Sequence, residues 1–172
     1  MASEQPAYFF QQGKDARCVL YALQNVVANL FNMDPMYFPS CEAFQAISRK
    51  IVSSYLWPIQ GLIAKKLYDV NPIEVVRKCS CTQEFWNVQI ALAWLTEKNI
   101  PYKVTKESDM QSDLSDQYFF LLVQLKKHQM SNHAICIVNG WLLDSLSAAP
   151  CIFTAENFTR EYVFLKGWKI LH

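Results

Sequence analysis

The sequence lacks the features that mark nucleic-acid-binding, membrane-surface and repeat proteins. Only four of its 172 residues are glycine, and it contains no internal repeat and no low-complexity segment. Its 16 basic and 15 acidic residues leave a net charge of +1, and no run of lysine and arginine stands out. Because binding to phosphate-rich surfaces depends on such runs, we expect neither nucleic acid nor an anionic membrane as a main partner.

Signals for export and for membrane insertion are also missing. The stretch MASEQPAYFFQQGKD at 1–15 has no basic start followed by an apolar core, which a secretory signal would have. The uncharged stretch at 51–64 is shorter than the roughly 20 residues that a spanning helix needs, and Pro58 interrupts it. These absences predict a soluble intracellular protein, located in the cytoplasm or the nucleus.

Cysteine patterns typical of disulfide frameworks and zinc sites are absent too. The chain has six cysteines, and in a chain without an export signal such residues are expected to be reduced. Cys79-Ser80-Cys81 is a close pair, but no second pair follows at zinc spacing. We therefore expect no metal and no other cofactor.

What is present suffices for one domain, residues 1–172, because 52% of the residues are hydrophobic and can bury a full core. Apolar spacing and capping residues predict helices first, at 15–32, 40–57, 71–79 and 82–99. After residue 100 the pattern changes to short apolar runs, which predict strands at 100–104, 118–125, 133–138, 141–146 and 161–171. Helices followed by an antiparallel sheet define an α+β fold.

Asn139-Gly140 lies between two of these apolar runs and predicts a two-residue type I′ hairpin turn. With these residues in the turn, opposite positions have numbers that add to 279. His133 and Asp144 then share one face of the hairpin as a diagonal pair, close enough for a carboxylate–imidazole hydrogen bond. Since their other neighbours on that face are apolar, the two polar groups are expected to satisfy each other.

Cys18 stands at the entrance of the first predicted helix, just behind Asp15-Ala16-Arg17, where Asp15 is a good N-cap. The positive end of the helix dipole favours the thiolate form of such a cysteine. A nucleophile, a base and an orienting group would then be Cys18, His133 and Asp144. Acyl transfer also needs hydrogen-bond donors for an oxyanion, and the Cys18 backbone N–H and the Gln12 side chain are candidates.

Each of these residues, taken alone, also fits a structural role. A single cysteine near a helix start is more often part of the packing than of chemistry. A histidine at a strand end is commonly a satisfied core or surface residue, and Asp144 could cap the turn that follows it. Only their combination favours catalysis.

Four blocks resemble those of Josephin-domain deubiquitinases, a branch of the papain-like cysteine proteases. QGKDARC at 12–18 is similar to the papain-like sequence around the nucleophile, and CVLYALQNVV at 18–27 to the Josephin nucleophile helix, with Tyr21 in place of a histidine. FWNVQIAL at 85–92 resembles a further Josephin helix, and NHAICIVNGWLLDSLSAAP at 132–150 resembles the hairpin that carries the catalytic histidine. The blocks come in family order.

The resemblance implies a papain-like fold, with a helical half packed on a sheet half and the active site in the cleft between them. It implies hydrolysis of isopeptide or peptide bonds at the C-terminus of ubiquitin or a ubiquitin-like protein, through a thioester. Cys18 would be the nucleophile, His133 the base, Asp144 the third member and Gln12 the oxyanion donor.

This chain departs from the family in four respects. Asp144 stands where Josephins usually have asparagine, and it follows His133 by only 11 positions. Gln12 fits the papain spacing better than the Josephin one, so Gln11 stays an alternative. Residues 32–71 match nothing in the family, and there Josephins carry a helical arm that controls substrate access.

Other functions remain open. The chain could be an ordinary papain-like peptidase, or an acyl or amide transferase that acts on another protein. It could also be a catalytically silent ubiquitin-binding module, with Tyr8, Phe9 and Phe10 as exposed contact residues.

Overall fold

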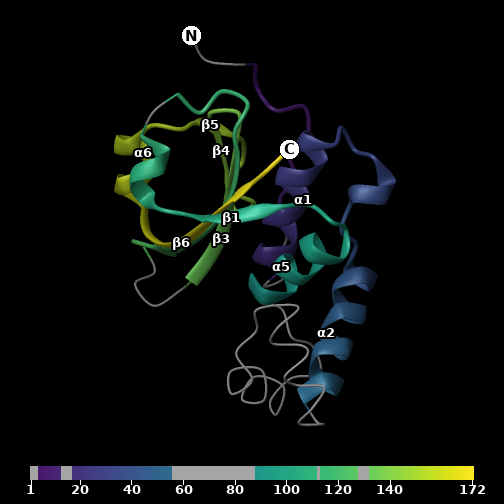
Figure 1. Cartoon of the computed structure of the whole chain (residues 1–172). Helices are drawn as coiled ribbons and strands as arrows, with labels where there is room; N and C mark the ends of the chain where they lie inside the picture. Colours follow the sequence, from purple (N-terminus) through teal and green to yellow (C-terminus); the bar gives the residue numbers. More distant parts are fainter. Residues whose placement is uncertain (1–3, 13–16, 56–87, 112, 128–131) are drawn as a thin grey trace. The chain divides into compact units, whose positions relative to one another are not determined.

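A computed structural model describes residues 4–12, 17–55, 88–111, 113–127 and 132–172 (Figure 1). Within them the protein is α+β: helices precede an antiparallel, open, six-stranded sheet, as the sequence predicts. The chain divides into two compact units, one of Met1–Phe38 with Pro101–His172 and one of Pro39–Ile100. Each unit is described by itself.

The unit Pro39–Ile100 contains two described helices that contact each other, α2 (Cys41–Tyr55) and α5 (Val88–Glu97). Helix α2 begins where the sequence predicts, because the Ser40 hydroxyl accepts a hydrogen bond from the backbone N–H of Ala43. Helix α5 is followed by Asn99, whose φ of 56° is the left-handed conformation that ends many helices. The predicted helix at 71–79 and the Cys79–Cys81 pair lie outside the described residues.

The unit Met1–Phe38 with Pro101–His172 holds the sheet. Its helical elements are α1 (Cys18–Leu30), α6 (Ala155–Glu161) and the 3-10 turns Pro35–Tyr37 and Glu107–Met110. Its strands are β1 (Tyr102–Thr105), β2 (Tyr118–Leu125), β3 (Asn132–Val138), β4 (Trp141–Leu143), β5 (Cys151–Ile152) and β6 (Tyr162–Ile170). They run in the order β1-β6-β2-β3-β4-β5, with every neighbouring pair antiparallel.

The two faces of the sheet are covered by different helices (Figure 1). Alternate residues of β2 and β3 pack with Phe158 of α6 in one core cluster that includes Phe119, Leu121, Ile135 and Ile137. The residues between them, such as Cys136, are equally buried but point to the other face, against which α1 lies. Among the described residues, no helix has the length and apolar character required to cross a membrane.

The hairpin between β3 and β4 has the predicted turn and register. Asn139 and Gly140 both have positive φ, 53° and 84°, as a type I′ turn requires, and Val138 pairs with Trp141. The predicted strand 141–146 is wrong beyond Leu143, because the returning strand ends there.

Asp144, the residue after β4, prevents that strand from continuing. Its Oδ1 accepts a hydrogen bond from the Leu146 N–H at 2.9 Å, and its backbone carbonyl accepts one from the Ser147 N–H at 2.9 Å. These two bonds fold the chain into a turn that a strand cannot continue through. The aspartate therefore caps a turn and also leaves its side chain on the His133 face of the hairpin.

Candidate active site

Cys18 is the first residue of α1. The sequence predicts Asp15 as the N-cap, and this is wrong: Arg17 occupies the N-cap position, without a capping hydrogen bond from its side chain. The thiol therefore lies at the very start of the helix, where the backbone N–H groups are not used within the helix. The backbone N–H groups of Val19 and of Ala134, on β3, donate to the Cys18 sulfur. This half-buried thiol is thus surrounded by donors that favour thiolate.

His133 is the second residue of β3 and is 3% exposed. Its Nε2 lies 2.7 Å from Asp144 Oδ1, and its side chain also hydrogen-bonds the Cys18 thiol. Because an ionised carboxylate only accepts hydrogen bonds, Nε2 carries a proton and donates it. The other ring nitrogen, Nδ1, is therefore the one left for the thiol.

Asp144 is 6% exposed and receives three hydrogen bonds. His133 and the Leu146 N–H donate to Oδ1, and the Tyr162 hydroxyl donates to Oδ2 at 2.6 Å. A buried carboxylate needs such donors to remain charged. The predicted His133–Asp144 bond is thus present, at hydrogen-bond distance and shielded from solvent.

The charges of the three residues support one another. Burial opposes ionisation of Cys18, but hydrogen bonds and the nearby His133 charge hold the pKa of the thiol below its usual value. Burial likewise acts against the imidazolium, yet Asp144 and Cys18 together raise the pKa of His133 to about 9. The pKa of Asp144 is lowered despite its burial, chiefly through the hydrogen bond from His133. The three pKa directions thus favour a thiolate, an imidazolium and a carboxylate, in that order along a row.

Two other described cysteines differ from Cys18. Cys136 is fully buried, and burial raises the pKa of its thiol far above the ordinary range. Burial and the charge of Asp144 also raise the pKa of Cys151. Both thiols are therefore expected to be much less reactive than Cys18 at neutral pH.

The upstream glutamines are held against the loop that follows Asp144. The Gln12 backbone N–H donates to the Ser145 carbonyl at 2.7 Å, and the Ser145 hydroxyl donates to Gln12 Oε1 at 3.1 Å. Gln11 is exposed, and its Nε2 donates to the Ser147 carbonyl at 3.0 Å. Since its carbonyl oxygen faces Ser145, Gln12 presents its amide N–H₂ on the side away from Ser145.

Two asparagines of α1, which sequence reasoning gave no role, hold the segment that leads to Gln12. The Asn25 side chain accepts from the Phe10 N–H at 2.6 Å and donates to the Phe10 carbonyl at 3.2 Å. Asn29 does the same with the backbone of Tyr8, at 3.2 and 2.8 Å. Their spacing of four positions, on one side of a largely apolar helix, was the available signal in the sequence. In the structure Asn25 is fully buried, and a buried amide must find partners.

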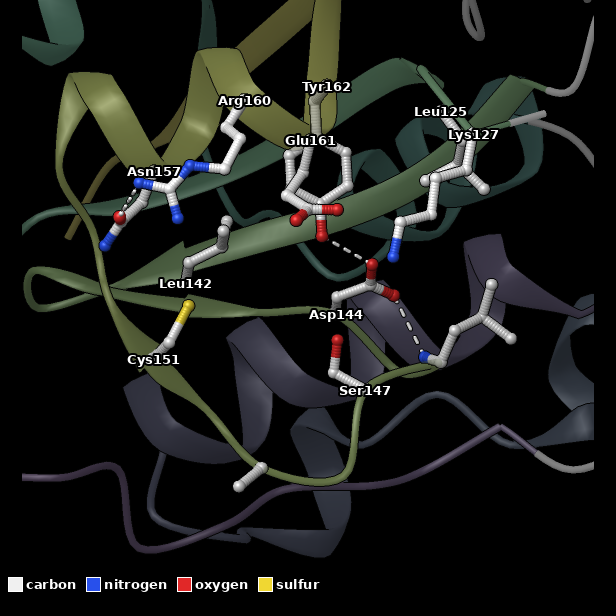
Figure 2. A pocket seen from close by; sticks show the side chains of 12 residues that line it. Leu125, Lys127, Leu142, Asp144, Ser147, Cys151, Asn157, Arg160, Glu161 and Tyr162 are labelled. Carbon is white, nitrogen blue, oxygen red and sulfur yellow. Dashed lines mark hydrogen bonds between the residues drawn. The ribbon is translucent and has the colours of Figure 1, made fainter. Parts of the chain in front are cut away.

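A pocket of about 610 Å³ reaches Asp144 from the side of α6 (Figure 2). Its lining includes Tyr162, Lys127, Arg160 and Glu161, together with apolar side chains such as Leu142. It does not include Cys18, His133 or Gln12. The pocket therefore opens beside the third member of the row, not at the thiol.

Comparisons with known proteins leave the family unassigned. No protein-family model matches the sequence, and the search of curated proteins finds no match either. In the part of the chain that the structure describes, no group of three or more His, Cys, Asp or Glu side chains is arranged to hold a metal ion. The chemistry that the site can perform thus follows from its own residues.

Proposed function

We propose that the protein is a cysteine hydrolase in which Cys18, His133 and Asp144 form the catalytic triad. One observation carries the proposal: the thiol at the start of α1 hydrogen-bonds an imidazole whose opposite nitrogen hydrogen-bonds a buried carboxylate. Three residues from two distant parts of the chain meet in the order that activates a thiol nucleophile. Burial of ionisable groups is costly unless they are paired, so the buried His133 and Asp144 and the half-buried Cys18 are stabilised by one another.

In the first half of the reaction the Cys18 thiolate attacks the carbonyl carbon of the scissile bond. A C–S bond forms and the carbonyl π electrons move to oxygen. When this oxyanion collapses, the C–N bond breaks, and the leaving amine takes its proton from the His133 imidazolium. The products are a thioester on Cys18 and a free amine.

In the second half a water molecule attacks the thioester while His133 takes its proton. The second oxyanion collapses, the C–S bond breaks, and the Cys18 thiolate is restored. Asp144 stabilises the imidazolium in both halves and keeps the ring in one tautomer, because it accepts from Nε2 throughout.

Gln12 is the proposed side-chain donor to the oxyanion, in preference to Gln11. The papain-like spacing of Gln12 and Cys18 favours Gln12, and its backbone and side chain are both bonded to Ser145, the residue next to Asp144. Gln11 is instead exposed, and its amide donates to the Ser147 carbonyl. The Cys18 backbone N–H, at the helix start, would be the second donor.

The proposed substrate is the C-terminus of ubiquitin or of a ubiquitin-like protein, joined to an amine. This part rests on the resemblance of four blocks to Josephin-domain deubiquitinases and on the papain-like spacing of Gln12 and Cys18. The aspartate in place of the family's asparagine suits this mechanism, since a carboxylate attracts the imidazolium more strongly than an amide does.

A silent binding module is the less favoured alternative. Tyr8, Phe9 and Phe10, which the sequence suggested as exposed contact residues, are half-buried instead. Asn25 and Asn29 hold the backbone of Tyr8 and Phe10, and the Phe10 ring packs against Phe38 with centroids 5.4 Å apart. These aromatics therefore support the site rather than form an open contact surface.

Labelling by ubiquitin with an electrophile at its C-terminus tests the proposal. The wild-type protein should form a covalent adduct, and Cys18→Ala should form none, although Cys41 and Cys151 remain. Cys151→Ala is the matched control and should label like the wild type. If ubiquitin and ubiquitin-like probes give no adduct while a generic peptide library is cleaved with Cys18 intact, the chain is an ordinary peptidase.

A further inference from the structure

We propose that Tyr162 is a positioning residue of the active site: its hydroxyl fixes Asp144 in the charged form and in the rotamer that faces His133. This inference rests on the proposed hydrolase function, in which Asp144 is the third member of the triad. It assigns a role to a residue of β6, a strand that none of the four resembling sequence blocks includes.

The contact is short and buried. The Tyr162 hydroxyl donates to Asp144 Oδ2 at 2.6 Å, and both residues are 6% exposed. Oδ1 already accepts from His133 and from the Leu146 N–H, so the phenol serves the second oxygen. Hydrogen bonds to an ionised carboxylate are short and about twice as strong as neutral ones. Figure 2 shows the tyrosine reaching down to the carboxylate from above.

The fold holds Tyr162 firmly in place. It is the C-cap of α6 and the first residue of β6, and its backbone N–H donates to the Phe158 carbonyl. Its ring packs against Phe158 with centroids 5.5 Å apart, and its Cα pairs with Leu125 across the sheet. The phenol therefore cannot follow a carboxylate that rotates away.

Removal of the hydroxyl would leave Oδ2 without its buried donor. Burial first, and then the Asp144 charge and the hydrogen bond to it, raise the pKa of Tyr162, so the phenol stays protonated and remains a donor. The same bond contributes to the lowered pKa of Asp144. Without it the carboxylate takes up a proton at a higher pH, the imidazolium loses its partner, and the thiolate is protonated in turn.

Several other ionisable groups act on Asp144 and must be held constant in any test. His133 on β3 hydrogen-bonds it, and Cys18 on α1 acts through His133. The charge of Asp144 also acts on Cys136 of β3, and the pocket beside it is lined by Cys151 of β5, Lys127 after β2, and Arg160 and Glu161 of α6. Because Tyr162→Phe changes none of them, their contribution is the same in both proteins.

The test is the pH dependence of Cys18 alkylation by iodoacetamide, followed by mass spectrometry of the Cys18 peptide. We expect the acid limb of the Tyr162→Phe profile to lie about one pH unit above that of the wild type, which is a roughly tenfold slower reaction at a given pH on that limb, because a hydrogen bond to a charged group contributes about 1.5 kcal/mol or more. At pH 8 the two should agree within about twofold, because the carboxylate is ionised in both. Tyr118→Phe, on the same sheet, is the matched control and should follow the wild type throughout.

A second variant separates positioning from mere packing. In an Asp144→Asn background the side chain at position 144 cannot titrate. Tyr162→Phe should then no longer change the acid limb of the pH profile of Cys18 alkylation. Equal profiles for the wild type and Tyr162→Phe, or the same acid shift in the Asp144→Asn background, would overturn the inference. If the wild-type Cys18 itself reacts like an ordinary thiol, the proposed hydrolase mechanism fails instead, which is a different result.

Discussion

The clearest prediction concerns Ser145, the buried serine that holds the Gln12 amide. Ser145 is 2% exposed, and its hydroxyl donates to Gln12 Oε1 at 3.1 Å. Ser145→Ala removes this bond but keeps the backbone bond from the Gln12 N–H to the Ser145 carbonyl. The segment should therefore stay in place while the Gln12 amide loses the hydrogen bond that orients its oxygen.

The expected loss follows from the strength of one neutral hydrogen bond. Such a bond contributes about 1 kcal/mol, so hydrolysis by Ser145→Ala should fall roughly five- to tenfold, mainly in kcat. Complete removal of the donor in Gln12→Ala should cost about a hundredfold or more, as for other oxyanion donors. Gln11→Ala, an exposed neighbour, is the matched control and should change the rate by no more than about twofold.

The assay compares two reactions of the same thiol. Hydrolysis of ubiquitin that carries a fluorogenic amide at its C-terminus passes through an oxyanion, whereas alkylation of Cys18 by iodoacetamide does not. Ser145→Ala and Gln12→Ala should therefore slow the first reaction and leave the second unchanged. The role of Ser145 is refuted if Ser145→Ala slows both reactions equally, or if it slows hydrolysis as much in a Gln12→Ala background as in the wild type.

Three further predictions concern the pH dependence and stability of the site. The pKa of His133 is raised from 6.5 to about 9, so the rate of hydrolysis should decline as the pH rises past about 9. The stability that the imidazolium contributes to the fold should be fully present below pH 6.5 and should be lost as the pH rises through about 9. Urea unfolding of the wild type and of His133→Ala measures the effect on stability: the difference between their unfolding free energies should become smaller as the pH rises over that range. Asp144→Ala should lower the unfolding free energy by roughly 3 kcal/mol, because it leaves a buried imidazolium unpaired. Asp144→Asn should lower it by less, and a smaller loss for the alanine variant than for the asparagine variant would contradict this prediction. Asn25→Ala should remove both hydrogen bonds to the Phe10 backbone and lower the unfolding free energy by about 2 kcal/mol. The N-terminal segment should then be cut rapidly in limited proteolysis, and an unchanged digestion pattern would disprove this.

The hairpin and its histidine–aspartate pair could be predicted from the sequence because local rules determine them. Asn139-Gly140 selects one turn type, and that turn sets which residues face each other. Asp144 follows His133 by 11 positions, so the register alone brings them close. The end of the strand at Leu143 was missed because Asp144 uses its side chain for a turn as well as for the pair.

The supporting residues could not be predicted in the same way. Tyr162 meets Asp144 because β6 inserts between β1 and β2, an order that no local pattern specifies. Ser145 meets Gln12 across 133 positions of chain, through a loop contact that depends on the finished fold. The start of α1 at Cys18 also departs from the capping rule that predicts Asp15, because the N-cap is Arg17, whose side chain makes no capping bond.

The proposed mechanism depends on a Cys18 thiolate that the His133 imidazolium stabilises. The most direct test is the alkylation rate of the Cys18 peptide against pH in the wild type and in His133→Ala. We expect Cys18 of the wild type to react at pH 6 at least about tenfold faster than in the variant, whose rate should rise only near the ordinary thiol pKa of about 8.5. Equal rates at pH 6, with both proteins following the ordinary thiol curve, would contradict the account.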